Sequence, residues 1–461
     1  MKSLKMIGVG MGLAVAAILA GPVSAMDERN TLLPENYRHY VPRIIPERIV
    51  LLPTATPENS QTVTWRTDSS LTDTVAEITR AVSHPGLHIG ARGVRGDSTL
   101  LRTENGTAHH HSVTFTGLAP DTLYAYRVKG TDTWSEWLQF RTPKAEFEPY
   151  EVLYFGDAQN AVKSHFSRTL REAQRQVPNA SLMIHAGDMV NSREGVHDDE
   201  WGEWFDAGGW LYGMTNQFVV PGNHEYLTIH EDDPRVLMPH WPAQFTVPDN
   251  GPQGMKDTVF YVDFQGVRYI SLDSQAALQD EANARLQAEW LDQVLQNNTA
   301  IWTIVVHHHP IFSVSLGRDN PIIRDLWQPL YEKHGVDLVF QGHDHTYGRG
   351  RAQGSTHGPV YVVSVAGPKM YLVSETAERN MDRTGEDRQL FQVIRFEEHR
   401  LSYQSLTATG ELYDAFDLVR ATRLDDKHPA GTEARCANTS PPRDTRCWNG
   451  TELIMSTAPL R

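Results

Sequence analysis

Short runs of β-branched and aromatic residues, separated by polar turn clusters, dominate the chain between residues 43 and 143. They include QTVTWRT, HSVTFTGL and LYAYRVKG, and turn-rich stretches such as ATPENS lie between them. Runs of this length are typical of strands that bury one face against a second sheet. The pattern predicts an all-β sandwich over residues 43–143.

The pattern changes after the polar, proline-bearing linker PKAEFEPYE at residues 143–151. Apolar runs such as VLYFG, SLMIHAGD and WTIVVHHH now alternate with longer segments of helical character, one of which is SHFSRTLREAQRQV. Alternation of buried strands with helices indicates an α/β architecture. We therefore predict an α/β domain over residues 151–421, followed by an irregular tail over 422–461.

The two ends of the chain indicate export. Residues 1–25 combine two lysines, a short apolar run and the small residues Val23-Ser24-Ala25. This is typical of a cleaved secretory signal peptide, because the apolar run is too short for a spanning helix. We expect a secreted or periplasmic protein without a membrane span once the signal is removed. Cys436 and Cys447, the only two cysteines, would then form a disulfide in the tail.

The charge of the chain restricts its partners. The formal net charge is −15, and removal of two lysines with the signal peptide makes it −17. An acidic protein repels nucleic-acid backbones, so we expect no nucleic-acid binding. An anionic substrate would require local positive charge, which bound metal cations supply.

Two histidine triplets invite a metal interpretation, and they differ in their surroundings. His109–His111 begin the predicted strand HHHSVTFTG, and no other metal-ligating residues lie nearby in the sequence. We interpret this triplet as part of a strand. His307–His309 instead end an apolar run, where a ligand site is expected in an open α/β sheet.

Several other apolar runs of the α/β domain also end in a metal-ligating residue. The carboxyl ends of parallel strands meet at one edge of a sheet, so these residues are expected to converge. Carboxylate, amide and imidazole together suit Mn, Fe or Zn ions. In chain order the strand-end residues are Asp157, Asp188, Asn223, His224, His307–His309, His343 and His345.

The ordered motifs GD-x, GD-x-x-x, GNHE, V-x-x-H-x-P and GHDH resemble those of the calcineurin-like metallophosphoesterases. The nearest branch is that of the purple acid phosphatases, which also carry an N-terminal fibronectin type III-like domain. The stretch GLAPDTLYAYRV resembles the fibronectin type III consensus, in which a tyrosine, here Tyr124 or Tyr126, holds its hydroxyl against the backbone. The resemblance implies a four-layer α/β sandwich of two sheets flanked by helices, with two divalent or mixed-valence metal ions on its rim.

The resemblance also implies a role for each matching residue. His224 corresponds to the family's proton donor or phosphate-stabilising histidine, and Glu225 beside it is either the partner of that ring or a solvated acid. His307 and His309 are interpreted as supporting or packing residues, because strand alternation turns them away from His308. The implied ligands are Asp157 and His345 for the first metal, Asp188 as the bridge, Asn223 and His343 for the second metal, and His308 as the histidine of V-x-x-H-x-P.

Three positions depart from the family pattern. The purple enzymes have tyrosine three residues after the bridging aspartate, where this chain has Asn191, so no purple colour is expected from that ligand. Related non-purple esterases have histidine two residues after the first aspartate, where this chain has Gln159. Asn191 or Gln159 could supply an amide oxygen to the first metal, or water could fill the position. Where plant members place paired histidines, Arg318 could bind phosphate or could be a solvated loop residue.

These observations predict an exported, metal-dependent phosphoric ester hydrolase, similar to acid phosphatases, that hydrolyses phosphate monoesters of small molecules with a metal-activated water. Two alternatives stay open. One is a phosphodiesterase or nucleotide hydrolase on the same scaffold, because loops determine which leaving groups reach the metals. The other is a degenerate protein that binds metal or phosphate without turnover.

Overall fold

The computed structural model describes residues 31–34, 37–191, 197–230, 233–353, 355 and 358–420, together with the backbone of three short strands between 435 and 455. The predicted signal peptide lies outside the described residues. The side chains of Cys436 and Cys447 also lie outside them, although the backbone register pairs the two positions across adjacent strands. The disulfide therefore stays a prediction.

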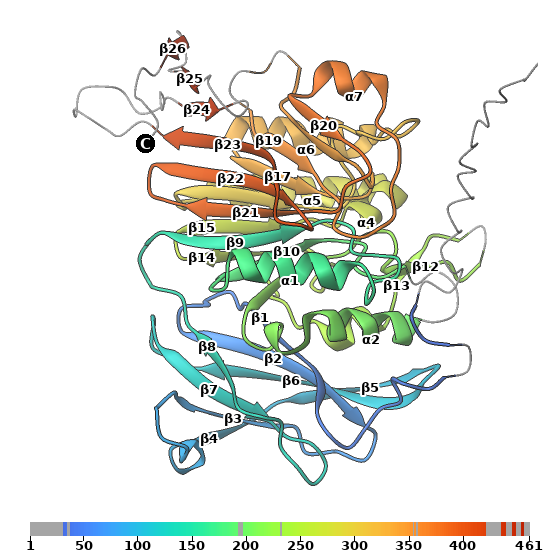
Figure 1. Ribbon diagram of the computed structural model, residues 1–461, viewed down its shortest axis with the longest axis vertical. Helices are drawn as coiled ribbons and strands as arrows, with labels where there is room; N and C mark the ends of the chain where they lie inside the picture. Colours follow the sequence, from blue (N-terminus) through green and yellow to red (C-terminus); the bar gives the residue numbers. More distant parts are fainter. Residues whose placement is uncertain are drawn as a thin grey trace, which may run out of the picture.

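The N-terminal part of the chain is a β-sandwich (Figure 1). Its first layer is a four-stranded sheet in the order β4-β3-β7-β8, and its second layer is formed by β1, β2, β6 and β5. These strands are β1 (Glu47–Leu52), β2 (Ser60–Asp68), β3 (Val75–Arg80), β4 (Arg92–Arg95), β5 (Asp97–Thr103), β6 (Gly106–Thr116), β7 (Leu123–Val128) and β8 (Leu138–Arg141). A 3₁₀ turn, Leu87–Ile89, lies between β3 and β4.

Tyr124 fills the position expected from the fibronectin type III resemblance. Its hydroxyl accepts a hydrogen bond from the backbone N–H of Ala119 at 2.9 Å. Tyr126 instead donates its hydroxyl to the carbonyl of Gly213, outside the sandwich, at 2.5 Å. One tyrosine therefore fixes a turn of the sandwich, and the other attaches the sandwich to the α/β part.

The second layer of the sandwich continues directly into the main sheet of the α/β part. The thirteen strands run in the order β26-β25-β24-β23-β22-β21-β9-β10-β11-β1-β2-β6-β5. At the junction β1 runs parallel to β11, with Leu51 opposite Asn216. The added strands are β9 (Tyr150–Phe155), β10 (Leu182–Ala186), β11 (Asn216–Val220), β21 (Leu390–Phe396), β22 (Arg400–Thr407), β23 (Leu412–Arg420), β24 (Arg435–Asn438), β25 (Thr445–Trp448) and β26 (Leu453–Met455).

A seven-stranded sheet packs against this main sheet, with the order β14-β15-β16-β17-β19-β18-β20. Its strands are β14 (Phe260–Phe264), β15 (Val267–Ser271), β16 (Trp302–Val306), β17 (Leu338–Gln341), β18 (Tyr347–Gly350), β19 (Val360–Val363) and β20 (Arg383–Gly385). A small hairpin, β12 (Tyr226–Leu227) with β13 (Val236–Leu237), lies beyond β11.

Helices cover the outer faces of both sheets, which completes four layers (Figure 1). Side-chain alternation explains the layering: in β9, Val152 and Tyr154 face the second sheet, while Leu153 and Phe155 face α1 and α2. The helices are α1 (Phe166–Gln176), α2 (His197–Gly208), α3 (His240–Gln244), α4 (Ser274–Gln279), α5 (Glu281–Gln296), α6 (Pro321–His334) and α7 (Glu375–Asn380), with a 3₁₀ turn at Gly209–Leu211. The predicted fold class, an all-β sandwich joined to a four-layer α/β sandwich, is confirmed.

Candidate metal centre

The predicted ligands lie where the carboxyl ends of strands from both sheets meet. Parallel strands β9, β10 and β11 of the main sheet are followed by Asp157, Asp188 and Asn223. Parallel strands β16 and β17 of the second sheet are followed by His308 and by the His343–His345 segment. All of these side chains are buried or nearly so. The rim shared by the two sheets therefore holds a cluster of metal-ligating groups.

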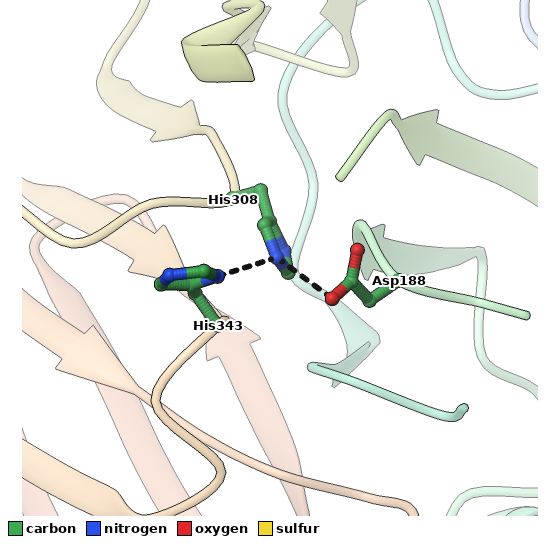
Figure 2. Close-up of side chains that lie close together, drawn as sticks. All are labelled: Asp188, His308 and His343. Atoms are coloured by element: carbon green, nitrogen blue, oxygen red, sulfur yellow. Dashed lines mark hydrogen bonds and ion pairs between the residues drawn. The ribbon is translucent and has the colours of Figure 1, made fainter. Parts of the chain in front are cut away.

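The ligand group of the expected second metal, called the second ligand group, contains Asp188, His308 and His343, whose atoms lie within 4.8 Å of one another. His308 Nε2 lies 3.1 Å from Asp188 Oδ2 and 3.3 Å from His343 Nδ1, as Figure 2 shows. The amide oxygen of Asn223 lies 3.2 Å from the same His308 nitrogen. The structure thus brings together the three residues and the amide expected around one metal.

The first ligand group, that of the expected first metal, contains Asp157, Asp188 and His345, also within 4.8 Å of one another. His345 Nε2 lies 3.7 Å from Asp157 Oδ1. Asp188 belongs to both groups, which is the arrangement required of a carboxylate that bridges two cations. The two groups together contain five of the six residues that the resemblance implied as ligands, and Asn223 lies beside the second group.

Hydrogen bonds fix which ring nitrogen of each histidine faces the site. His308 Nδ1 donates to the carbonyl of Ala186 at 2.8 Å, and His345 Nδ1 donates to the carbonyl of Lys369 at 3.0 Å. Each ring therefore turns Nε2 toward the aspartates. A hydrogen bond from the other ring nitrogen commonly orients histidine ligands in this way. The two carbonyls come from segments far away in the sequence, and no local motif indicated them.

The backbone at the ligands is strained. The backbone φ values of Asp157, Asp188, His343 and His345 are 35°, 49°, 73° and 50°. Residues other than glycine rarely adopt positive φ values. Strain of this kind persists only where the surrounding structure enforces it, and it concentrates at functional sites. A Cβ atom on Gly222 would collide with Asp188 Oδ1, so the GNHE loop can approach the bridging carboxylate only with glycine there.

The electrostatics of the cluster fit cations. Burial raises the pKa of Asp157 well above its usual range, and its Oδ1 atom has no hydrogen-bond partner. Burial alone would lower the pKa of His308, but the charges of Asp188 and Asp157 outweigh it and raise that pKa to about 9. The aspartates therefore require positive charge beside them, which metal ions would supply.

The three residues of the second histidine triplet, His307–His309, have different roles. Only His308 belongs to a ligand group. His307 Nδ1 donates to the carbonyl of His309 at 2.8 Å, and its ring packs between Trp327 and Tyr331. The His309 ring packs on His343 with centroids 4.1 Å apart, and its Nδ1 lies 2.9 Å from Ser274 Oγ.

The first triplet has a structural role. His111 lies 2.8 Å from the hydroxyls of both Thr67 and Thr74, and its ring stacks on Trp65. Neither ligand group found in the described part of the chain includes a residue of His109–His111.

Gln159 lies at the first ligand group. Its Nε2 atom donates to Asp188 Oδ2 at 2.8 Å and lies 3.0 Å from His345 Nε2, and the side chain is fully buried. Its Oε1 atom has no hydrogen-bond partner. The amide is thus positioned to supply an oxygen ligand if its two terminal atoms exchange places, since nitrogen and oxygen differ only by a rotation.

Asn191 contacts His224 and Glu200 through its backbone. Its carbonyl accepts a hydrogen bond from His224 Nδ1 at 2.6 Å, and its N–H donates to Glu200 Oε2 at 2.5 Å. Its side-chain amide stays a predicted ligand.

Of the two alternatives drawn from the sequence for Glu225, the solvated acid is wrong, and the role as partner of the His224 ring stays a prediction. It is fully buried, so it is not a solvated acid. Its carboxylate accepts hydrogen bonds from the backbone N–H groups of Asp188, Met189 and Gly222 at 2.9, 2.8 and 2.7 Å. Burial and the charge of Asp188 raise its pKa to about 7. Glu225 therefore links the loop that carries Asp188 to the loop that carries Asn223.

Arg318 contacts the GHDH loop. Its Nη1 atom donates to the carbonyl of His343 at 2.5 Å and lies 3.3 Å from Asp344 Oδ1. Asp344 in turn accepts hydrogen bonds from the backbone of Val314 and Ser315. Asp344 was not predicted from the sequence, where its place between His343 and His345 was the signal that could have indicated it. Arg318 holds the backbone of His343, a candidate ligand, and its contact with phosphate stays a prediction.

The fold and the ligand cluster define a metallophosphoesterase, and comparison with protein families agrees. Residues 150–347 match the calcineurin-like phosphoesterase family, and residues 46–142 match the N-terminal domain of purple acid phosphatases. The chain is therefore a member of the calcineurin-like phosphoesterases. Within them it belongs to the purple acid phosphatase-like branch.

Individual relatives are distant. Purple acid phosphatase 23 of Arabidopsis thaliana is 26% identical over 57% of this chain and 63% of its own length. Purple acid phosphatase 21 of the same plant is 24% identical over 70% of this chain and 72% of its own length. Acid phosphatase type 7 of Mus musculus is 25% identical over 67% of this chain and 71% of its own length. The chain thus spans less than two thirds of the first of these relatives.

Solved structures support the fold. A purple acid phosphatase from yellow lupin seeds superposes with a TM-score of 0.68 at 17% identity, covering 84% of this chain and 77% of the lupin chain. A structure of PhoD superposes with a TM-score of 0.57 at 12% identity, covering 90% of this chain and 93% of that one.

Proposed function

We propose that this protein is a metal-dependent phosphatase that hydrolyses phosphate monoesters of small molecules. The observation that supports this most directly is the pair of ligand groups that share Asp188 at the rim of the two sheets. Membership of the calcineurin-like phosphoesterases points to the same chemistry. The cluster contains no serine or cysteine nucleophile, and phosphoryl transfer needs none when positioning and charge neutralisation are provided.

The donor set indicates which ions would be held. Asp157 and His345 would bind one cation, Asn223, His308 and His343 the other, and Asp188 both. Carboxylate, amide and imidazole ligands suit Fe, Mn or Zn. Since the chain has Asn191 where a phenolate ligand stands in the purple enzymes, we favour divalent ions over a ferric one. When bound, such a pair neutralises the charge that builds on phosphate oxygens and lowers the pKa of water.

His224 is the proton donor in this proposal. Its backbone N–H donates to Asp188 Oδ1 at 2.8 Å, and its ring is held through Nδ1 by the Asn191 carbonyl. The other ring nitrogen, Nε2, lies 3.8 Å from Asp188 Oδ2. With Nδ1 engaged, Nε2 is the atom that would pass a proton to the departing alcohol oxygen. Glu225 supports this arrangement by fixing the loops on which Asp188 and His224 lie.

Export is part of the proposal and rests on the sequence of residues 1–25. Within the described residues, no helix has the length and apolar character needed to cross a bilayer. Fractionation of cells that produce the full chain, with mass determination of its N-terminus, tests this. An intact N-terminus in a cytosolic fraction would contradict it.

The activity is tested by metal analysis together with a substrate panel. Purified protein is reconstituted with Fe, Mn or Zn and assayed on p-nitrophenyl phosphate, bis-p-nitrophenyl phosphate and nucleotides. We expect about two metal equivalents per chain and the highest rate on the monoester. A higher rate on the diester would reject monoester preference. Fewer than two equivalents without hydrolysis would favour a binding protein instead.

His224→Asn separates proton donation from metal binding. We expect kcat to fall by a factor of about 10² to 10⁴ on an alkyl phosphate, and by less on p-nitrophenyl phosphate, because a good leaving group needs little help from an acid. Metal content should not change. An equal loss on both substrates would contradict the assignment of His224 as the acid.

A further inference from the structure

A polar cavity of about 560 Å³ opens beside the second ligand group. The ligand residues Asn223 and His343 form one end of it, and His309, Arg235, Gln275 and Gln279 line the rest. Apart from Pro234 the lining is polar, so the cavity suits a hydrated or charged part of a substrate better than an aromatic group.

Arg235 is the residue of this lining that carries positive charge. Its backbone is fixed to α4: its N–H donates to Gln279 Oε1 at 2.7 Å, and its carbonyl accepts from Gln279 Nε2 at 3.2 Å. The side chain is partly buried. Asp233, the acidic residue of the lining, is exposed to solvent, so its charge is better screened than that of the arginine. Arg235 therefore lines the cavity from an anchored backbone.

His309 also lines this cavity, and its ring packs on that of His343. Ser274 fixes its ring, because the serine hydroxyl both accepts from the His309 backbone N–H at 2.9 Å and contacts Nδ1 at 2.9 Å. The ring nitrogen that remains for a ligand in the cavity is Nε2. The lining thus combines His309 and Arg235 with Asn223 and His343, two of the residues proposed to hold the metals.

We propose that this cavity accepts the leaving-group side of a substrate that carries a second anionic group, and that Arg235 selects such substrates. A phosphoanhydride, such as inorganic pyrophosphate or a nucleoside diphosphate, fits this chemistry. This inference rests on the proposed phosphatase function. Water would add to the terminal phosphorus while the bond from that phosphorus to the bridging oxygen breaks. The bridging oxygen would leave with the second phosphate and take up one proton, and Arg235 would offset the charge of that group.

Binding is measured first, without turnover. Methylenediphosphonate, which cannot be hydrolysed, and methylphosphonate are titrated calorimetrically into the metal-loaded protein and into Arg235→Gln. We expect the variant to bind methylenediphosphonate about tenfold more weakly and methylphosphonate within about twofold of the parent. Equal weakening of both ligands, or of neither, would overturn the proposal.

Arg285→Gln is the matched control. Arg285 is an exposed residue of α5 that pairs with Glu281, so the variant removes the same charge away from the cavity. It should leave both affinities unchanged. Arg235→Lys keeps a positive charge without the planar fork, and it should bind methylenediphosphonate with intermediate affinity. This conservative variant keeps the test available if Arg235→Gln does not fold.

Turnover distinguishes this inference from the proposed function. We expect Arg235→Gln to lower kcat/KM for pyrophosphate about tenfold and to leave that for p-nitrophenyl phosphate nearly unchanged. A wild-type protein that hydrolyses neither compound would contradict the proposed function. A wild-type protein that hydrolyses both, with a variant that loses activity on both equally, would contradict only the selectivity of Arg235.

Discussion

Gln159 Nε2 donates a hydrogen bond to Oδ2 of Asp188 at 2.8 Å, and the same nitrogen lies 3.0 Å from His345 Nε2. A neutral amide thus touches two residues of the first ligand group at the position where related esterases have histidine. The amide oxygen beside it is buried and has no partner, although buried polar atoms are normally satisfied. A cation in the first ligand group would give it one once the amide is turned so that the oxygen faces Asp188 and His345.

We expect Gln159→His to tighten binding of the first cation and Gln159→Ala to weaken it by a factor of about 10 to 100. The reason is that histidine restores a ligand, whereas alanine removes every polar atom at this position. Metal content after dialysis against a graded metal buffer measures the effect. Gln61→Ala, which removes a buried amide from the sandwich, is the control and should leave metal content unchanged. Identical metal content in both Gln159 variants would exclude Gln159 from the first metal.

Asn191→Tyr should introduce a visible absorption band when the protein is loaded with ferric iron. The phenolate would then occupy the position that it has in the purple enzymes, and phenolate stabilises the trivalent ion. The backbone contacts of Asn191 with Glu200 and His224 do not involve the side chain that changes. Asn191→Phe has the same ring without the oxygen, so it should give no band. Matching spectra from the two variants would show that residue 191 does not face the metals.

Asp198→Asn should lower the free energy of unfolding by about 3 to 5 kcal/mol. Asp198, near the start of α2, pairs with Arg48 at 2.7 Å and with Arg66 at 2.8 Å, and all three side chains are buried. The substitution would leave the buried Arg48 guanidinium without a carboxylate and Arg66 with Glu47 alone. Urea unfolding at pH 7 measures the loss. Glu281→Gln breaks only the exposed pair with Arg285 and should change the stability by less than about 0.5 kcal/mol.

Stability should fall as the pH is lowered from about 6.5 to 4. Burial lowers the pKa of His111, His185 and His240 to about 4, against about 6.5 in the unfolded chain. The unfolded state therefore binds more protons in this range, so these residues contribute their full stability above pH 6.5 and lose it as the pH falls toward 4.

His111→Gln tests this pH dependence. The variant should reduce the slope of unfolding free energy against pH by about 1 kcal/mol per pH unit between pH 4.5 and 6. His84→Gln, at an exposed position, is the control. If the two variants give the same slope, His111 does not take up the proton on unfolding.

The ligand cluster could be predicted because each of its members is marked locally. Asp157, Asp188 and His308 each follow an apolar run that is long enough to identify a strand, and strand ends converge by geometry alone. Glu225 could not be predicted in the same way. Its partners, the backbone N–H groups of Asp188 and Met189, lie 36 or more residues away, and backbone groups leave no trace in a sequence. The same limit applies to Ala186 and Lys369, whose carbonyls orient two of the histidines.

The sandwich could be predicted as a unit, but its attachment could not. The apolar run of β1 identifies it as a strand. Its pairing with β11 involves one pair of opposite residues, Leu51 and Asn216, which nothing in the sequence marks. Gln61 of β2 adds a side-chain hydrogen bond to Asn216 at 2.8 Å. Polar residues in strands have many possible partners, so neither contact could be read in advance.

The continuity of β1 with β11 has a consequence for any attempt to shorten the protein. A truncated chain that starts at the linker would expose the backbone N–H and C=O groups of β11 that now face β1. An exposed edge strand of this kind pairs with strands of other molecules. It would also unpair Asp198 from both arginines. The N-terminal sandwich is thus not a detachable accessory, and the hydrolytic half deprived of it is expected to precipitate rather than to work alone.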